Sequence, residues 1–104
     1  MNEPPTHPGL SERELTLLRG VFARHPDLTA VRLFGSRAKG THTPRSDIDL
    51  AVWGNAFTDL RAEGIASDLD ELPLPYKFDV RHFDSITLPA LREHIERFGI
   101  PIWP

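Results

Sequence analysis

Three aspartates and a Gly-Ser dipeptide are the residues of this sequence whose types and spacing could do chemistry. Gly35 and Ser36 follow an apolar segment, and after ten further residues come Asp47 and Asp49; Asp79 stands between two apolar residues in a later segment. Residues two apart on a strand share a face, so Asp47 and Asp49 are expected to project together, about 6–7 Å apart along the chain. Three carboxylates beside a phosphate-sized turn predict a site for divalent metal and a nucleoside triphosphate.

The predicted carboxylate cluster suits magnesium better than it suits a metal-free fold. Mg²⁺ prefers hard oxygen ligands, and two ions about 4 Å apart serve many phosphoryl-transfer sites. Without a cation, carboxylates this close repel one another and at least one pKa rises. The alternative interpretation is that Asp47 and Asp49 line a solvated strand face. For Asp79, the alternative is a surface aspartate opposite Lys77 or Arg81.

The Gly35-Ser36 dipeptide is predicted to bind phosphate. Glycine lets the backbone approach a ligand closely and adopt a positive φ. A serine that begins a helical turn offers a hydroxyl group and unpaired backbone N–H groups. Arg37 could add a fork of donors to the same phosphates. The alternatives are an ordinary turn for the dipeptide and an exposed cation at a helix end for Arg37.

The elements that must position these residues are predicted from hydrophobic spacing and from turn residues. A capping box, Ser11 with Glu14, begins a helix that ends near residues 24–25, before Pro26. Strands are predicted at residues 30–34, 46–53 and 76–83, with a single helical turn at 36–39 and a short edge strand at 100–103. A second long helix carries the apolar stripe Phe57, Leu60, Ile65, Leu69 and Leu72, and a last helix begins at Pro89.

The order of these elements predicts an α/β (α+β) fold with a small mixed β-sheet flanked by helices. Ile48, Leu50 and Val52 are expected on one face of their strand, with the aspartates on the other. Asp79 can reach the aspartate pair if its strand lies beside residues 46–53. Four aromatic side chains are predicted to belong to the core: Phe22, Phe34, Phe78 and Phe98.

Length and composition narrow the range of functions. A chain of 104 residues is one domain, interpreted as a flexible leader at residues 1–9 and a folded domain at 10–104. The net charge of −3 supplies no positive field for nucleic acid, which argues against direct nucleic-acid binding. The absence of cysteine excludes disulfides and thiolate metal sites. No apolar run approaches a membrane span or a secretory signal, so no membrane contact and a cytoplasmic location are expected.

The spacing of the site residues resembles the signature of a known family. That family is the minimal nucleotidyltransferases of the DNA polymerase β-like superfamily. The likeness is carried by Gly35-Ser36, ten residues and then Asp47-x-Asp49, between the apolar flanks Phe34 and Leu50, and by Phe78-Asp79-Val80 around the third carboxylate. It covers residues 11–103 and implies the polymerase β-like fold.

The resemblance also implies roles and a partner. Gly35 and Ser36 would bind the triphosphate of ATP, Asp47 and Asp49 would hold two Mg²⁺ ions, and Asp79 would serve the catalytic ion. The family often works as the antitoxin of a two-gene module whose partner is a helical HEPN-type ribonuclease toxin. The resemblance therefore implies either transfer of AMP to a hydroxyl of that toxin or neutralisation by binding alone. A small-molecule nucleotidyltransferase is a third alternative.

Overall fold

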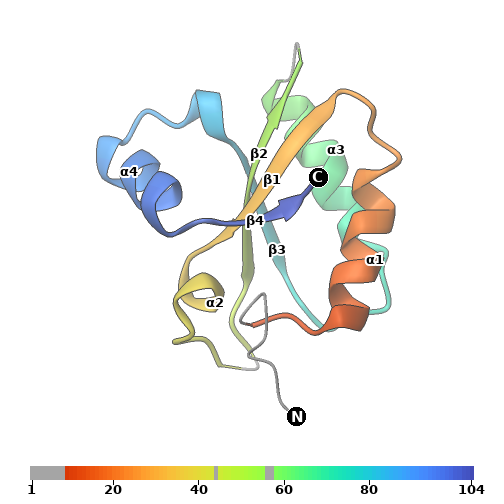
Figure 1. The fold of residues 1–104 in the computed structure, drawn as a ribbon. Coiled ribbons are helices and arrows are strands. Elements are labelled where there is room, and N and C mark those ends of the chain that lie inside the picture. Colours follow the sequence, from red (N-terminus) through yellow and green to blue (C-terminus); the bar gives the residue numbers. More distant parts are fainter. Residues whose placement is uncertain (1–8, 44, 56–57) are drawn as a thin grey trace.

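The sheet at the centre of the molecule is mixed, as the sequence predicts. The computed structural model describes residues 9–43, 45–55 and 58–104. Its four strands lie in the order β3-β2-β1-β4 (Figure 1). Their bounds are β1 Leu28–Phe34, β2 Ile48–Gly54, β3 Phe78–His82 and β4 Ile100–Trp103. β1 pairs antiparallel with β2 and with β4, whereas β2 and β3 are parallel. β4 is therefore the edge strand that the C-terminal residues predict.

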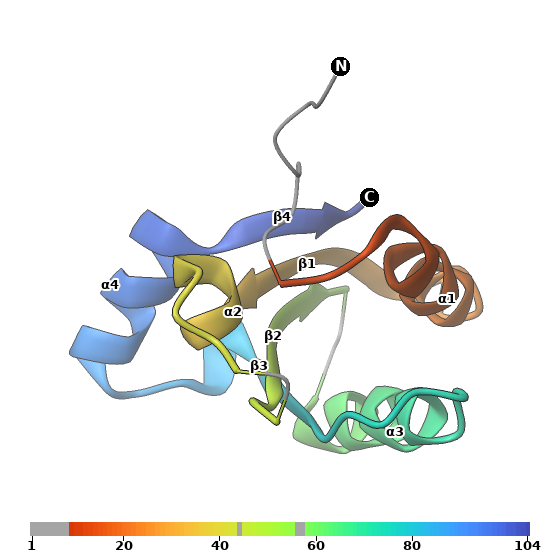
Figure 2. The same cartoon turned by 90° about the horizontal axis from the view of Figure 1, so that it is seen from below.

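Helices cover both faces of the sheet. Figure 2 shows α1 and α3 on one side and α2 and α4 on the other. Their bounds are α1 Glu12–Phe22, α2 Ser36–Lys39, α3 Asp59–Asp70 and α4 Pro89–Phe98, with a short 3₁₀ turn η1 at Phe83–Ser85. Among the described residues, no helix combines the length and apolar character that crossing a bilayer requires.

The helix α1 begins at the predicted capping box. The Ser11 N–H donates to Glu14 Oε1 at 2.9 Å, and the Glu14 N–H donates to Ser11 Oγ at 3.1 Å. These two bonds satisfy N–H groups that the first turn of a helix leaves without partners. Its buried side chains are the apolar ones that the sequence places at helical spacing: Leu15, Leu18, Val21 and Phe22.

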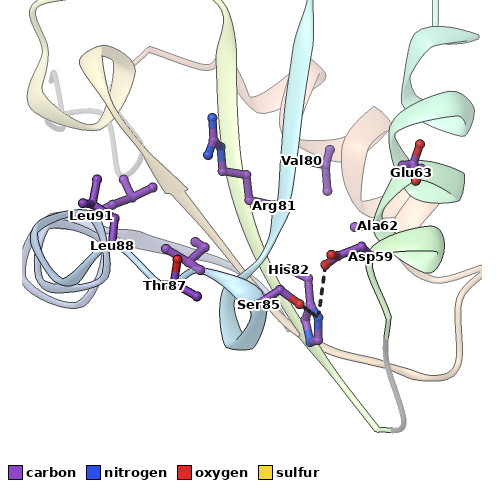
Figure 3. Close-up of a pocket in the computed structure, with 11 residues that line it drawn as sticks. Asp59, Ala62, Glu63, Val80, Arg81, His82, Ser85, Thr87, Leu88 and Leu91 are labelled. Carbon is purple, nitrogen blue, oxygen red and sulfur yellow. Dashed lines mark hydrogen bonds and ion pairs between the residues drawn. The ribbon is translucent and has the colours of Figure 1, made fainter.

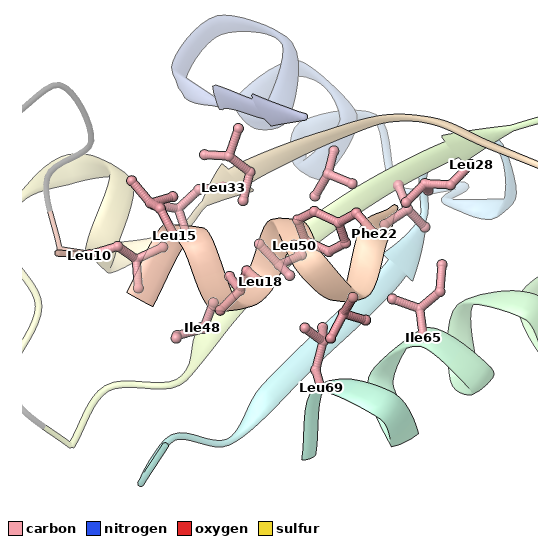
Figure 4. Close-up of a cluster of buried hydrophobic side chains, with 14 of the residues drawn as sticks. Leu10, Leu15, Leu18, Phe22, Leu28, Leu33, Ile48, Leu50, Ile65 and Leu69 are labelled. Carbon is pink, nitrogen blue, oxygen red and sulfur yellow. The ribbon is translucent and has the colours of Figure 1, made fainter. Parts of the chain in front are cut away.

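The main core lies between the sheet and the helices α1 and α3 (Figure 4). Ile48, Leu50 and Val52 of β2 have no solvent exposure, and β1 sends Val31 and Leu33 to the same face. Burial of each such side chain stabilises the fold by about 1.5–3 kcal/mol. Because side chains alternate along a strand, this packing forces the residues between them, including Asp49, onto the opposite face.

A smaller apolar cluster holds α4 on that opposite face. It consists of Phe34, Ala51, Phe83 and Ile95, with Trp53, Ile86 and Leu91 packed against it. The Trp53 and Phe83 rings stack with their centroids 4.7 Å apart. The cluster reaches as far as Phe34, which is the Cα partner of Asp49 in the neighbouring strand.

Two apolar side chains predicted to be buried are exposed. Leu60 is 75% exposed and Phe98 is 50% exposed, so both predictions were wrong. Leu60 lies five residues before the buried Ile65, which places it about 140° round the helix from the buried stripe. Phe98 is the last residue of α4, and its ring lies under the Lys39 ammonium, 5.9 Å from the ring centroid. Phe57, also predicted in the stripe, lies outside the described residues.

The bounds of three strands also differ from the sequence prediction, and β1 begins at Leu28 rather than at residue 30. β2 begins at Ile48 rather than at residue 46, and β3 spans Phe78–His82 rather than 76–83. The Ser46 hydroxyl instead accepts the Thr43 N–H at 2.9 Å, which keeps Ser46 in the preceding loop. Asp47 therefore precedes the strand that carries Asp49. Of the predicted leader, residues 1–8 lie outside the described part.

Candidate active site

Asp49 and Asp79 lie side by side in the sheet. The parallel register of β2 and β3 makes them direct Cα partners. Neighbouring strands are about 4.8 Å apart, and side chains of paired residues point to the same face. The condition stated for Asp79, that its strand lies beside the strand of Asp49, is thus met. Asp47 is exposed, two residues before Asp49.

The carboxylates interact strongly enough to change the ionisation of Asp49. Partial burial and the negative charges of Asp79 and Asp47 together raise the pKa of Asp49 from its ordinary 3.8 to about 6, against a smaller opposing effect of Arg81. Burial and like charges both disfavour the ionised form of a carboxyl group. The fold therefore brings the charges of Asp47, Asp49 and Asp79 together, and Arg81 offsets their effect on Asp49 only in part.

Arg81 is a cation in contact with this group of carboxylates. It shares a face with Asp79, two residues earlier on β3, and its Nε donates to Asp79 Oδ2 at 3.3 Å. Both side chains are close to half exposed, so this ion pair adds little stability. The pairing matches the alternative considered for Asp79, that of a surface aspartate opposite Arg81.

Gly35 contacts the Asp49 carboxylate directly. Its backbone has φ 76° and ψ −153°, a conformation that residues with a Cβ rarely adopt. A Cβ at this position would lie 2.3 Å from Asp49 Oδ2. Glycine suits this position because any other residue would adopt a strained backbone conformation and would also displace the Asp49 carboxylate. The turn predicted to bind phosphate and the carboxylate predicted to bind metal are therefore in contact.

Ser36 is the first residue of α2, as predicted. The helix is a single turn of four residues that ends at Gly40, where φ is 76° and ψ is 12°. The Thr41 N–H donates to the Ser36 carbonyl at 3.0 Å, which closes the turn. Ser36 itself is partly exposed.

Arg37 is placed differently from its two neighbours. Its side chain is only 3% exposed. The guanidinium donates to the carbonyls of Gly9 at 2.6 Å and Ser46 at 3.0 Å, and its plane lies 4.5 Å from the centroid of the Tyr76 ring. These contacts direct the donors into the protein, which differs from the predicted phosphate contact. Arg37 instead fastens the loop that leads to Asp47.

Tyr76 links Arg37 to α1. Its hydroxyl donates to the Glu14 carboxylate, and that hydrogen bond raises the pKa of Tyr76. The chain of contacts from Glu14 through Tyr76 to Arg37 joins the start of α1 to the segment before β3 and to α2. The loop carrying Asp47 therefore rests on the folded core and not only on its own turns.

The family follows from a match that spans most of the chain. A model of the family described as polymerase beta, nucleotidyltransferase matches residues 17–103. The chain belongs to this nucleotidyltransferase family. No curated protein sequence matches the chain.

Solved structures agree with the family. The chain is similar to a toxin–antitoxin crystal structure determined with AMP-PNP, at 26% identity and a TM-score of 0.70, covering 90% of this chain and 73% of that chain. It is similar to a candidate minimal nucleotidyltransferase at 32% identity and a TM-score of 0.66, covering 86% and 89%. A complex of a tri-AMPylated Shewanella oneidensis HEPN toxin with its MNT antitoxin matches at 21% identity and a TM-score of 0.59, covering 86% and 71%, which shows the shared fold.

The donor set of this nucleotidyltransferase suits a divalent ion such as Mg²⁺. Carboxylate oxygens are its preferred ligands, and the raised pKa of Asp49 shows negative charge that a cation would relieve. In the described residues, however, no three carboxylate or imidazole side chains are gathered closely enough to hold a metal as they stand. A metal held by all three carboxylates would require Asp47 and Asp79 to turn toward Asp49.

A pocket of about 460 Å³ opens at the edge of β3 in this nucleotidyltransferase (Figure 3). It lies between the start of α3 and the segment that leads into α4, and its walls include Arg81, His82, Leu88 and Leu91. None of the six predicted site residues lines it. Arg81 connects it to the site, since this side chain both lines the pocket and pairs with Asp79.

Sequence reasoning missed one contact of the nucleotidyltransferase site. The Gly35 N–H donates to His94 Nε2 of α4 at 3.4 Å. Fifty-nine positions separate the two residues in the chain. A single histidine on an amphipathic helix carries no signal in the sequence that would reveal such a contact.

Proposed function

We propose that this protein transfers AMP from ATP to a hydroxyl group of a HEPN-type toxin protein, in a reaction that requires Mg²⁺, and that it is the antitoxin of the pair. The observation that carries the proposal is the placement of Asp49, with a pKa raised to about 6, beside Asp79 and against Gly35. Clustered carboxylates destabilise a metal-free fold. Their presence is understandable if a cation and a triphosphate bind there.

Each carboxylate has a part in the proposed reaction. Asp47, Asp49 and Asp79 would hold two Mg²⁺ ions, which would neutralise charge on the triphosphate when bound. The acceptor hydroxyl oxygen forms a bond to the α-phosphorus of ATP, the bond to the bridging oxygen breaks, and pyrophosphate leaves. Asp79 takes the hydroxyl proton. Most of the rate enhancement comes from placement and charge neutralisation.

The turn beside Asp49 is proposed to hold the triphosphate. Gly35 brings the backbone close to the carboxylate, and Ser36 presents a hydroxyl group and the first N–H groups of α2. Arg37 supports the site indirectly, because its guanidinium donates to the Ser46 carbonyl and so holds the loop that leads to Asp47. The predicted phosphate contact of Arg37 is therefore replaced in the proposal by a supporting role.

The proposed partner comes from the structural neighbours. One similar structure is a toxin–antitoxin crystal structure with AMP-PNP, at 26% identity. An antitoxin could also neutralise its toxin by binding alone. The hydrogen bond that Arg81 donates to Asp79 favours neutralisation by binding alone, since it engages the Asp79 carboxylate before any metal binds.

The test is label transfer from α-labelled ATP to the co-purified partner, with and without Mg²⁺. The wild type should label the partner, Asp49→Asn should not, and Asp70→Asn should label it normally because Asp70 is exposed on α3, away from the site. No transfer by the wild type with Mg²⁺ and a verified partner would overturn the proposal. Neutralisation of the toxin by the Asp49→Asn variant would favour binding alone.

A further inference from the structure

We infer that His94 of α4 is a positioning residue that holds the Gly35-Ser36 turn in the shape needed for the triphosphate. The inference rests on the proposed function, because the triphosphate is its proposed ligand. The contact that suggests it is the hydrogen bond from the Gly35 N–H to His94 Nε2, at 3.4 Å in a partly buried position. His94 belongs to neither the signature residues nor the carboxylate cluster.

The His94 ring is held in place from two directions. It meets the Phe34 ring edge-on, with centroids 6.2 Å apart and an interplanar angle of 76°. It also meets the Phe98 ring at a tilted angle, with centroids 5.5 Å apart. Phe34 is the last residue of β1, immediately before Gly35. The imidazole is thereby fixed relative to the strand that leads into the turn.

The turn needs such support because its backbone is unusual. Gly35 has φ 76° and ψ −153°, and conformations of this kind persist only when the surroundings determine them. The Asp49 carboxylate blocks one side of Gly35, at the place a Cβ would occupy. His94 takes the N–H of the same residue. Two contacts from different elements, β2 and α4, therefore set the direction in which the chain enters α2.

The contact also assigns chemistry to both partners. A ring nitrogen that accepts an N–H must carry a lone pair, so the imidazole bears its hydrogen on Nδ1. The Gly35 N–H is engaged by the protein and not by the ligand. Phosphate contacts therefore fall to the Ser36 hydroxyl and to the backbone N–H groups that follow it. A turn already held in this direction needs no rearrangement when the triphosphate arrives.

Two substitutions separate the hydrogen bond from the ring packing. His94→Phe keeps an aromatic ring against Phe34 and Phe98 and removes the acceptor. His94→Gln loses the ring and places a carbonyl oxygen at a similar reach. If the acceptor matters, His94→Phe lowers kcat/KM for ATP by about 10- to 100-fold, and His94→Gln stays within about 3-fold of the wild type. A role in packing alone predicts the reverse order.

A second measurement does not depend on catalysis. Amide hydrogen exchange of Gly35, measured by NMR on the metal-free protein, should be about 10-fold faster in His94→Phe than in the wild type and His94→Gln. The His94 ring nitrogen shifts of the wild type should identify the tautomer with its hydrogen on Nδ1. Equal exchange of Gly35 in all three proteins, or a hydrogen on Nε2, would overturn the inference.

The two measurements together separate this inference from the proposed function. Suppose that Gly35 exchanges faster in His94→Phe than in the other two proteins, and that the wild type transfers no AMP. The exchange result then supports the role of His94 in the turn, and the missing transfer overturns the proposed reaction. Normal transfer by His94→Phe overturns the inference and leaves the reaction standing.

Discussion

Replacement of Asp49 by asparagine should make the protein more stable and remove its proposed activity. Asparagine has nearly the same shape as aspartate and carries no charge. It therefore removes the cost of burying an ionised group and the repulsion from Asp79 and Asp47. It also removes the central metal ligand. An increase in stability with a loss of activity is what a charge held for function predicts.

The magnitude follows from the pKa of Asp49. A rise from 3.8 to about 6 corresponds to about 3 kcal/mol for a fully buried group. Asp49 is only partly buried, so solvent screening reduces the expected gain to about 1–2 kcal/mol. Because the folded state binds the Asp49 proton more tightly than the unfolded state, this effect lowers stability as pH rises from about 4 to about 6. The Asp49→Asn advantage should be complete above that range and vanish below it.

The assay is urea unfolding of wild type and Asp49→Asn at pH 7.5 and pH 4, without divalent ions. The midpoints should differ at pH 7.5 and converge at pH 4, with unchanged slopes. Asp70→Asn is the control, because Asp70 is an exposed carboxylate of α3, and it should follow the wild type at both values. Equal midpoints of wild type and Asp49→Asn at pH 7.5 would refute the reasoning about clustered charge.

Three further predictions concern the same region. Gly35→Ala should lower the free energy of unfolding by more than about 3 kcal/mol, since backbone strain of about 1–3 kcal/mol adds to the clash of the new Cβ with the Asp49 carboxylate. Gly40→Ala is the control in the same urea assay: its Cβ meets open space, so it should lose only about 1–2 kcal/mol. Arg37→Ala should cost about 2–4 kcal/mol, because it removes a buried guanidinium and leaves the partly buried carbonyls of Gly9 and Ser46 without this donor, whereas Arg45→Ala at an exposed position should stay within about 0.5 kcal/mol. Equal losses would contradict the supporting role of Arg37. Calorimetric Mg²⁺ affinity should rise as pH increases toward about 6 and then level off, because the proton on Asp49 competes with the metal; a flat profile would show that Asp49 is not a ligand.

Local patterns predicted most of the secondary structure. The capping box at Ser11 and Glu14 and the alternation in β2 depend on residues close in sequence, so their outcome does not require knowledge of the rest of the chain. Boundaries were less certain, because a side chain can prefer a loop contact. Ser46 lies outside the strand because its carbonyl accepts a hydrogen bond from Arg37 and its hydroxyl accepts one from the Thr43 N–H of the loop.

Burial could not be predicted at element ends. Leu60 and Phe98 have the apolar character of core residues, but Leu60 lies on the face of α3 turned away from the buried stripe and Phe98 is the last residue of α4. Arg37 shows the opposite case. A cation expected to reach solvent or ligand is buried, because carbonyls of two distant segments and an aromatic ring surround it.

The sequence by itself determined which residues could form the site, since the Gly35-Ser36 turn and the alternating aspartates are features of local spacing. It also predicted the mixed sheet and the family. Only the tertiary structure decided that Asp49 and Asp79 stand in register, that the Asp49 carboxylate fills the space beside Gly35, and that His94 takes the Gly35 N–H. The reason is physical: strand pairing and helix packing bring together groups that are far apart in the chain, and burial and charge then change how each group ionises.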